Sequence, residues 1–288
     1  MSIPAAFDYH PAKTVDEAIA LLREYSDDAK VLAGGHSLLP AMKLRLSQPG
    51  HLIDIGRIDG LSYIREEGDV IAVGALTTYM KILNSDLLKR HFQALTEAAL
   101  DLGDQQVRNR GTLGGSLAHS DPAGDMPAVA LALKADIVAQ GPNGKRTIPA
   151  NDFFIDTFTT ALQPDEILTE IRFKIPSART GTAYMKLENK ASHYAITGSA
   201  AMITLDGAGM CTEASVTITG ASTKTVRASA VEAALVGKKL DEATVAAAAQ
   251  HATDHLDLVE DIHGSKAYRG QMTVVMMRRA ILKALEQI

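Results

Sequence analysis

The chain has 288 residues, 46% of them hydrophobic and 22% charged, so it is long and apolar enough for two or three compact globular units. Its formal net charge of −5 and the lack of any block of Lys and Arg argue against a nucleic-acid partner. No apolar run approaches the roughly 20 residues that span a bilayer, and no secretory signal pattern precedes the first helix. We therefore expect a cytoplasmic protein without a transmembrane segment.

The first unit is expected to alternate strands with helices and to end near residue 56. Thr14 and Glu17 have the spacing of a capping box, in which a hydroxyl and a carboxylate satisfy free N–H groups at a helix start. That helix should run to about Tyr25. Short strands are expected at residues 30–32 and 51–55, with a helix at residues 38–46 between them.

The second unit, to residue 177, is expected to combine antiparallel hairpins with helices. Turn sequences at residues 66–69 and 141–144 lie between strand-like runs and predict two hairpins. The expected strands are residues 61–65, 70–73, 137–140, 146–148 and 166–175. Three helices are expected: one that ends near residue 83, one at residues 88–102 and one at residues 126–134.

The third unit begins after residues 176–181, where Pro176 and Gly181 interrupt the pattern. Three strand-like runs then precede three helix-like runs, which favours an α+β domain over residues 178–288. The strands are expected at residues 183–187, 196–205 and 210–219, and the helices at residues 228–236, 241–255 and 266–286.

Two glycine-rich stretches separate strand-like from helix-like segments. The longer, residues 110–127, contains four glycines, and the shorter, residues 32–40, contains a Gly-Gly pair. Glycine lets the backbone approach a ligand closely, and successive N–H groups before a helix start can bind an anion. Either stretch alone is typical of a tight turn. Together, each with a serine soon after its glycines, they favour two halves of one pyrophosphate cradle.

Five polar residues near these stretches each have two interpretations. Asp125, at a helix start, is a cap or dipole partner, or it accepts the hydroxyls of a ribose. Lys186 is a surface charge on a strand, or it reaches the ligand if the third unit packs over the glycines. Tyr194 would then lie on a flat ring. His36 and His119 are turn or rim residues, or they contact the phosphate or the ring of a bound ligand.

Several familiar catalytic and nucleotide-binding patterns are absent from the sequence. It has no G-x-G-x-x-G after a strand, no P-loop and no nucleophile elbow. The single cysteine, Cys211, excludes an iron–sulfur cluster or multi-cysteine metal site built by this chain alone. We therefore assign no catalytic acid, base, nucleophile or metal ligand.

Seven segments carry a family resemblance, and three of them read AGGHSLLP, VRNRGTLGG and DPAGDMP. The segments are residues 7–10, 33–40, 51–54, 65–68, 107–115, 121–127 and 261–265. In this order they resemble the FAD-binding medium subunits of molybdenum hydroxylases, most of all the carbon monoxide dehydrogenase branch. The resemblance covers essentially the whole chain. It implies an α+β FAD-binding fold of the vanillyl-alcohol-oxidase (PCMH) type, with two subdomains that clasp FAD and a C-terminal domain of three strands and three helices.

The resemblance also implies which residues hold FAD. Residues 33–37 and 112–116 would wrap the pyrophosphate through their backbone N–H groups, and Asp125 would hold the ribose. Leu168 would touch the isoalloxazine, Lys186 would approach its polar edge, and Tyr194 would lie near the ring. The complete expected set is Leu32, Ala33, Gly34, Gly35, His36, Ser37, Leu38, Leu102, Gly111, Thr112, Gly114, Gly115, Ser116, Ala118, Asp125, Leu168, Lys186 and Tyr194.

Related chains commonly carry a basic cluster just after the strand that holds Lys186. This chain has Glu188, Asn189 and Lys190 there. The surroundings of the exposed flavin face, and therefore docking and the choice of acceptor, are expected to differ from those of relatives.

The family implies that substrate is oxidised at a molybdenum cofactor on a large partner subunit. Electrons would pass through two [2Fe–2S] clusters of a small subunit to FAD on this chain, and then to an external acceptor such as a quinone. The expected assembly is a cytoplasmic dimer of heterotrimers, or one held peripherally at the inner face of the membrane. The favoured enzyme is carbon monoxide dehydrogenase. The alternatives are an aldehyde or N-heterocycle dehydrogenase acting on compounds such as xanthine, nicotine or quinoline, a self-contained FAD oxidoreductase, and a nucleotide-binding protein without redox activity.

Overall fold

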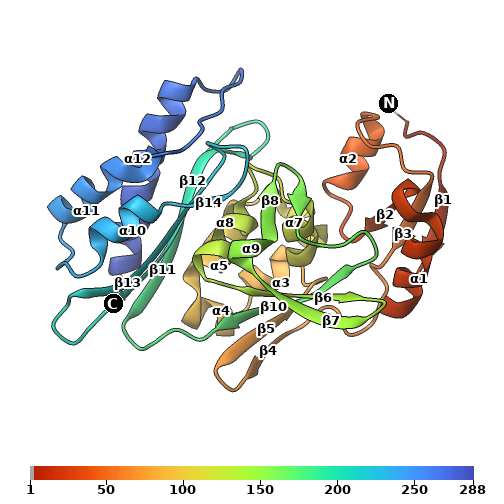
Figure 1. Ribbon diagram of the computed structural model, residues 1–288, viewed down its shortest axis with the longest axis horizontal. Helices are drawn as coiled ribbons and strands as arrows, with labels where there is room; N and C mark the ends of the chain where they lie inside the picture. Colours follow the sequence, from red (N-terminus) through yellow and green to blue (C-terminus); the bar gives the residue numbers. More distant parts are fainter. Residues whose placement is uncertain (1–2) are drawn as a thin grey trace.

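The computed structural model describes residues 3–288, whose three main sheets follow one another along the chain (Figure 1). The first sheet is parallel with strand order β1-β3-β2. Thr14 caps its first helix by accepting the N–H of Glu17 at 3.1 Å, while the Glu17 carboxylate accepts the N–H of Lys13 at 2.7 Å. This unit contains β1 (Asp8–Pro11), α1 (Val15–Tyr25), a 3₁₀ turn (Ser26–Asp28), β2 (Ala29–Leu32), α2 (Leu38–Lys43) and β3 (His51–Asp54).

The second sheet is antiparallel with strand order β4-β5-β10-β6-β7, and it contains both expected hairpins. Its strands are β4 (Ile64–Glu67), β5 (Val70–Gly74), β6 (Asp136–Gly141), β7 (Gly144–Pro149) and β10 (Ile167–Lys174). The helices of this unit are α3 (Tyr79–Leu83), α4 (Asp86–His91), α5 (Gln93–Asp101), α6 (Gln105–Arg110), α7 (Leu113–His119), α8 (Asp125–Ala132) and α9 (Ala150–Phe153), and a small hairpin joins β8 (Phe154–Asp156) to β9 (Thr159–Thr160).

The single helix expected at residues 88–102 is wrong, because α4 and α5 are separated at Phe92. Phe92 has φ −144° and ψ 69°, outside the helical region, and its side chain is fully buried. Its ring packs against that of Phe173 on β10, with centroids 5.6 Å apart. Burial of this aromatic ring against the sheet therefore outweighs the helical periodicity of the local sequence.

The third sheet has four strands in the order β11-β12-β13-β14, not the three expected. The additional strand, β14, has only two residues and pairs with β13, too short to leave a periodic signal in the sequence. The helix expected at residues 241–255 also ends early and continues as a 3₁₀ turn. The elements are β11 (Thr180–Glu188), β12 (Ala195–Leu205), β13 (Cys211–Thr219), β14 (Val226–Arg227), α10 (Ser229–Leu235), α11 (Glu242–Ala249), the turn Gln250–Thr253 and α12 (Lys266–Leu285).

Helices cover both faces of the third sheet, with α10–α12 on the outer face and α5 and α8 between this sheet and the second one (Figure 1). Side chains alternate accordingly: Ala183 and Ala201 contribute to the core with α12, whereas Tyr184 and Ala200 contribute to the central core. All eight residues of α8 are buried. A helix that is apolar on every side is explained by this position between two sheets.

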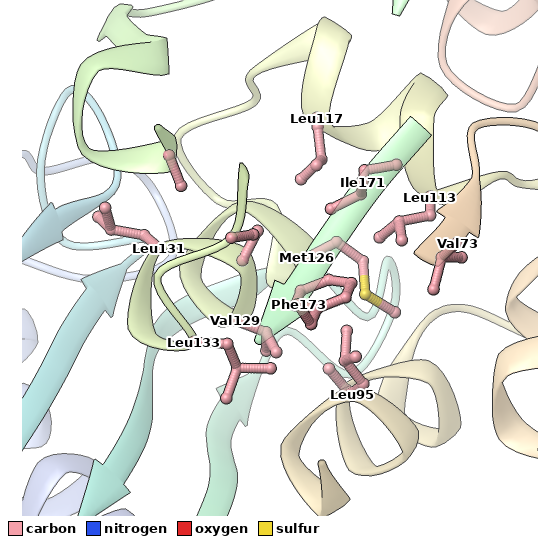
Figure 2. Packing of buried hydrophobic residues seen from close by; sticks show 14 of the residues in the cluster. Val73, Leu95, Leu113, Leu117, Met126, Val129, Leu131, Leu133, Ile171 and Phe173 are labelled. Carbon is pink, nitrogen blue, oxygen red and sulfur yellow. The ribbon is translucent and has the colours of Figure 1, made fainter. Parts of the chain in front are cut away.

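The central core joins the second sheet to α5, α7 and α8. Figure 2 shows Leu113, Met126 and Val129 of the helices gathered beside Ile171 and Phe173 of β10. Hydroxyl groups of the third sheet add polar contacts to α8 and to the loop before it. Thr217 Oγ1 donates to Ala128 O at 2.9 Å, and Thr219 Oγ1 lies 2.8 Å from Gly124 O. Among residues 3–288, no helix combines the length and apolarity needed to cross a membrane.

Candidate functional site

The structure brings the two glycine stretches into direct contact, as the sequence predicts. A Cβ added to Gly34 would lie 2.1 Å from the carbonyl oxygen of Arg110, so only glycine allows this approach. A Cβ on Gly115 would lie 3.7 Å from Cβ of Ala33. Residues that are about 80 positions apart in the sequence therefore form one surface.

The first stretch presents a row of free backbone donors. Within residues 3–288, the N–H groups of residues 34–38 have no hydrogen-bond acceptor, and Ser37 does not cap α2 with its side chain. Gly35 has φ +77°, a conformation that favours glycine and that aims successive N–H groups to one side. Such an arrangement at a helix start suits a phosphate group.

The second stretch differs from the expected wrapping loop, because its Gly-Gly pair lies in the first turn of α7. Thr112 caps this helix and accepts the N–H of Gly115 at 3.2 Å. The N–H groups of Leu113, Gly114 and Ser116 donate to Thr77 O, Ala75 O and Thr112 O. In this structure the N–H groups of Leu113, Gly114, Gly115 and Ser116 therefore all have protein acceptors, and backbone binding of an anion by residues 112–116 stays a prediction.

The remaining glycines of this stretch are explained by packing. A Cβ on Gly114 would lie 2.6 Å from Cβ of Ala75, and one on Gly111 would lie 2.4 Å from the ring of Tyr79. Thr112 is buried, Gly115 and Ser116 are half-buried, and Ala118 is exposed. Surface for a ligand is therefore offered by Gly115, Ser116 and Ala118.

Two tyrosines connect other elements to the glycine stretches. Tyr79, at the start of α3, is buried; burial raises the pKa of its phenol, and the Ser116 hydroxyl interacts with it. Tyr194, which follows β11, is 45% exposed and interacts with the Ser37 hydroxyl. The sequence indicated Tyr194 but missed Tyr79, whose only signal is an aromatic residue between a strand and a helix.

A buried ion pair lies at the start of α8. Asp125 Oδ2 is 2.9 Å from Lys186 Nζ, and the two side chains are 3% and 2% exposed. Asp125 Oδ1 accepts the hydroxyl of Tyr184. Burial raises the pKa of Asp125 to about 6, while Lys186 and Tyr184 act in the opposite direction. Lys186 also donates to Asp101 O at 2.9 Å and to His193 O at 2.8 Å.

The sequence singled out Asp125 and Lys186 as separate ligand contacts, and the structure shows that they are also partners of each other. All three N–H donors of Lys186 have acceptors. The sequence missed Tyr184, although it lies two residues before Lys186 in β11 and so shares its face of the sheet.

Three further expected contacts lie on other elements. Leu168 on β10 is 5% exposed and belongs to the central core, and Leu102 is half-buried after α5. Tyr194 borders a hollow of about 490 Å³ that is also lined by Phe158 and Asn189.

The two histidines of the glycine stretches have local partners. His36 Nδ1 lies 3.1 Å from Gly34 O, two residues earlier, which is typical of a turn. The ring of His119 packs near that of Phe158, with centroids 4.9 Å apart, and burial lowers its pKa.

The end of β11 and the residues after it carry paired charges. The Glu188 carboxylate pairs with Lys190 Nζ at 2.9 Å and with His193 Nδ1 at 3.0 Å, and these two groups lower the pKa of Glu188 to about 2. Arg108, which precedes the second glycine stretch, donates from its Nη1 to Leu100 O, Leu102 O and Gly103 O.

Comparisons with known proteins agree along the whole chain. The FAD binding domain in molybdopterin dehydrogenase matches residues 5–177, and the CO dehydrogenase flavoprotein C-terminal domain matches residues 182–284. The carbon monoxide dehydrogenase medium chain of Hydrogenophaga pseudoflava is 42% identical over 97% of both chains. The 6-hydroxypseudooxynicotine dehydrogenase complex subunit alpha of Paenarthrobacter nicotinovorans is 39% identical over 99% of this chain and 96% of its own.

A solved structure gives the same result. The structure is that of carbon monoxide dehydrogenase from Hydrogenophaga pseudoflava, in a form that lacks the Mo-pyranopterin moiety of the molybdenum cofactor. One of its chains superposes on this chain with a TM-score of 0.95 at 44% identity, and the match covers 99% of both chains. Both the sequence and the fold therefore lead to one assignment. The chain belongs to the family of FAD-binding medium subunits of molybdenum hydroxylases.

Proposed function

We propose that this chain is the FAD-carrying electron-transfer subunit of a carbon monoxide dehydrogenase. The observation that carries the proposal is the row of free N–H groups at residues 34–38, placed directly against the start of α7 in a chain of this family. Bound FAD exchanges one or two electrons, and the protein holds and tunes it.

The residues present fit FAD. Residues 34–38 would donate to the pyrophosphate, helped by the hydroxyl of Ser116 and by Gly115, where no side chain blocks approach. Asp125 would hold the ribose, and Lys186 would set the charge at the polar edge of the flavin. Tyr194 would lie near the ring, and Leu168 would pack against the isoalloxazine. Leu32, Ala33, Leu38, Leu102, Gly111, Thr112, Gly114 and Ala118 complete the proposed site.

The proposed partners follow from the chemistry that this chain lacks. One cysteine cannot hold an iron–sulfur cluster, so in the proposed enzyme the clusters that supply electrons belong to another subunit. We place two [2Fe–2S] clusters on a small subunit, the molybdenum cofactor on a large one, and two copies of the resulting heterotrimer in the assembly. A quinone or another external acceptor would receive the electrons.

We also place the domain boundary at residues 177–178.

A second enzyme is supported by a specific observation. The relative from the 6-hydroxypseudooxynicotine dehydrogenase complex is almost as similar as the carbon monoxide dehydrogenase chain, at 39% against 42% identity. The second candidate is therefore the same subunit in an enzyme that hydroxylates a nitrogen heterocycle.

The test is to purify the native complex through a tag on this chain, with an untagged strain as control. We expect FAD in equal amount to the chain, with iron and molybdenum in co-purifying small and large subunits. Carbon monoxide added without oxygen should bleach the flavin absorbance within the complex. Bleaching by an N-heterocycle and not by carbon monoxide would select the second candidate, and a chain without flavin would overturn both. Flavin on a lone chain that substrate reduces directly would indicate a self-contained oxidoreductase.

A further inference from the structure

Tyr184 is the one member of the buried group around Asp125 that has no role in the proposed FAD site so far. Its side chain is 1% exposed, and its hydroxyl donates to Asp125 Oδ1. The neighbouring strand leaves room for this hydroxyl, because a Cβ on Gly198 would lie 2.8 Å from it. The backbone N–H of Tyr184 donates to Glu97 of α5 at 2.8 Å, which fixes the strand against the helix.

The phenol of Tyr184 stays protonated at ordinary pH and so keeps the hydrogen that it donates to Asp125. Burial raises its pKa well above 10, and the adjacent Asp125 raises it further. A hydrogen bond donated to a carboxylate favours the ionised form of that carboxylate. Tyr184 and Lys186 therefore both oppose the effect of burial on Asp125.

The charges that face Asp125 come from several elements. Lys186 and Tyr184 lie on β11, and Asp101 lies at the end of α5. The phenols of Tyr79 and Tyr194 are also within electrostatic reach. Lys186 is the cation of this group: it contacts the Asp125 carboxylate directly and also attracts the Asp101 carboxylate.

We propose that Tyr184 is a positioning residue of the FAD site, whose hydroxyl keeps the Asp125 carboxylate ionised and bound to Lys186, so that the pair presents little net charge to the flavin. This inference rests on the proposed FAD function. Removal of the hydroxyl would favour protonation of Asp125 and leave the positive charge of Lys186 less compensated, with Asp101 as the remaining carboxylate in the group. A positive charge near the flavin stabilises its electron-rich reduced form.

The experiment compares Tyr184→Phe with the parent in the complex purified through this chain. The flavin is titrated with reductant at pH 7.5 and pH 5, and the deflavinated complex serves as the blank for iron–sulfur absorbance. At pH 7.5 we expect the ratio of reduced to oxidised flavin at a fixed potential to rise about tenfold, equivalent to about 30 mV for a two-electron couple. At pH 5, where Asp125 of the parent is itself protonated, the two proteins should agree.

Tyr63→Phe is the matched control, since the Tyr63 hydroxyl also donates to a carboxylate, that of Glu170, next to the second sheet. An unchanged flavin potential in Tyr184→Phe at pH 7.5, or an equal shift in Tyr63→Phe, would overturn the inference. Asp125→Asn should shift the flavin potential in the same direction, and Tyr184→Phe should add nothing to it.

Asp125→Asn also covers the case in which Tyr184→Phe does not assemble, because an unchanged potential in Asp125→Asn would by itself overturn the inference. A parent complex without FAD would instead overturn the proposed function. The two failures are therefore distinguishable.

Discussion

Replacing Gly34 by alanine should force the two glycine stretches apart. The new Cβ would lie 2.1 Å from the carbonyl oxygen of Arg110 and 3.0 Å from Cα of Gly111. Both neighbours are backbone atoms, so no side-chain rotation can relieve the overlap. Carbon–oxygen contacts are tolerated from about 3.3 Å, which requires a separation of the two segments by about 1 Å.

Such overpacking destabilises a protein by about 1–3 kcal/mol, and a contact between two backbones belongs at the upper end of this range. For domains of about 150–250 residues, each kcal/mol lowers Tm by about 2–4 °C. We therefore expect the Tm of the FAD-free Gly34→Ala chain to fall by about 5–10 °C. The further rise in Tm that added FAD produces in the parent should also shrink, because the donors at residues 34–38 move with the displaced segment.

The assay is thermal unfolding of the full chain by circular dichroism, with and without FAD. Gly207→Ala is the matched control, since nothing lies within 4 Å of its added Cβ and its φ is not positive. Gly115→Ala separates packing from binding, because its Cβ meets only the rotatable hydroxyl of Thr112 at 2.7 Å and the Cβ of Ala33 at 3.7 Å. Its FAD-free Tm should fall less than that of Gly34→Ala, because only the Thr112 cap has to shift, while FAD binding weakens. A Gly34→Ala chain as stable as Gly207→Ala would refute the packing, and unchanged FAD affinity in Gly115→Ala would refute the site.

Three further outcomes are expected. The folded pKa of Asp125 is about 6, above its ordinary 3.8, so the folded state binds more protons than the unfolded state between these pH values. The free energy of unfolding should therefore increase as pH falls from 7 towards 4. Asp125→Asn should remove this contribution in urea titrations, and an unaltered pH dependence in the variant would contradict the reasoning. Arg269→Met should cost about 2–4 kcal/mol in urea unfolding, since its buried guanidinium donates to three backbone carbonyls and pairs with Asp261. Arg278→Met, which breaks an exposed ion pair on the same helix, should cost less than about 1 kcal/mol. Tyr194→Ala should weaken FAD binding about three- to tenfold by fluorescence titration, and Tyr194→Phe should retain it; equal losses in both would exclude a role for the ring.

The sequence predicted the parts of the site that depend on local chemistry. The glycine pairs, the acid at the start of α8 and Lys186 could all be recognised, because the residue types themselves indicate an anion site and its surroundings. The main-chain donors at residues 34–38 follow from the same local pattern. These features require only that the two stretches meet, and the structure shows that they do.

The remaining features depend on contacts between distant residues. Tyr184 is an ordinary aromatic residue in a strand until its hydroxyl meets Asp125, 59 positions earlier. The break at Phe92 likewise arises from packing against Phe173, which no local pattern contains. The position of α7 was partly visible, because Thr112 is a good N-cap residue, but the glycines after it favoured a loop.

Helix α8 also constrains the order of events during synthesis. It starts with Asp125, yet the groups that cover and anchor it, Tyr184, Lys186, Thr217 and Thr219, leave the ribosome much later. Until they do, a helix that is buried on every side in the folded chain has only one of its two sheets to pack against. The proposed cofactor site can therefore be completed only after the third sheet has been synthesised. Hybrids between relatives should accordingly exchange α8 and the third sheet together.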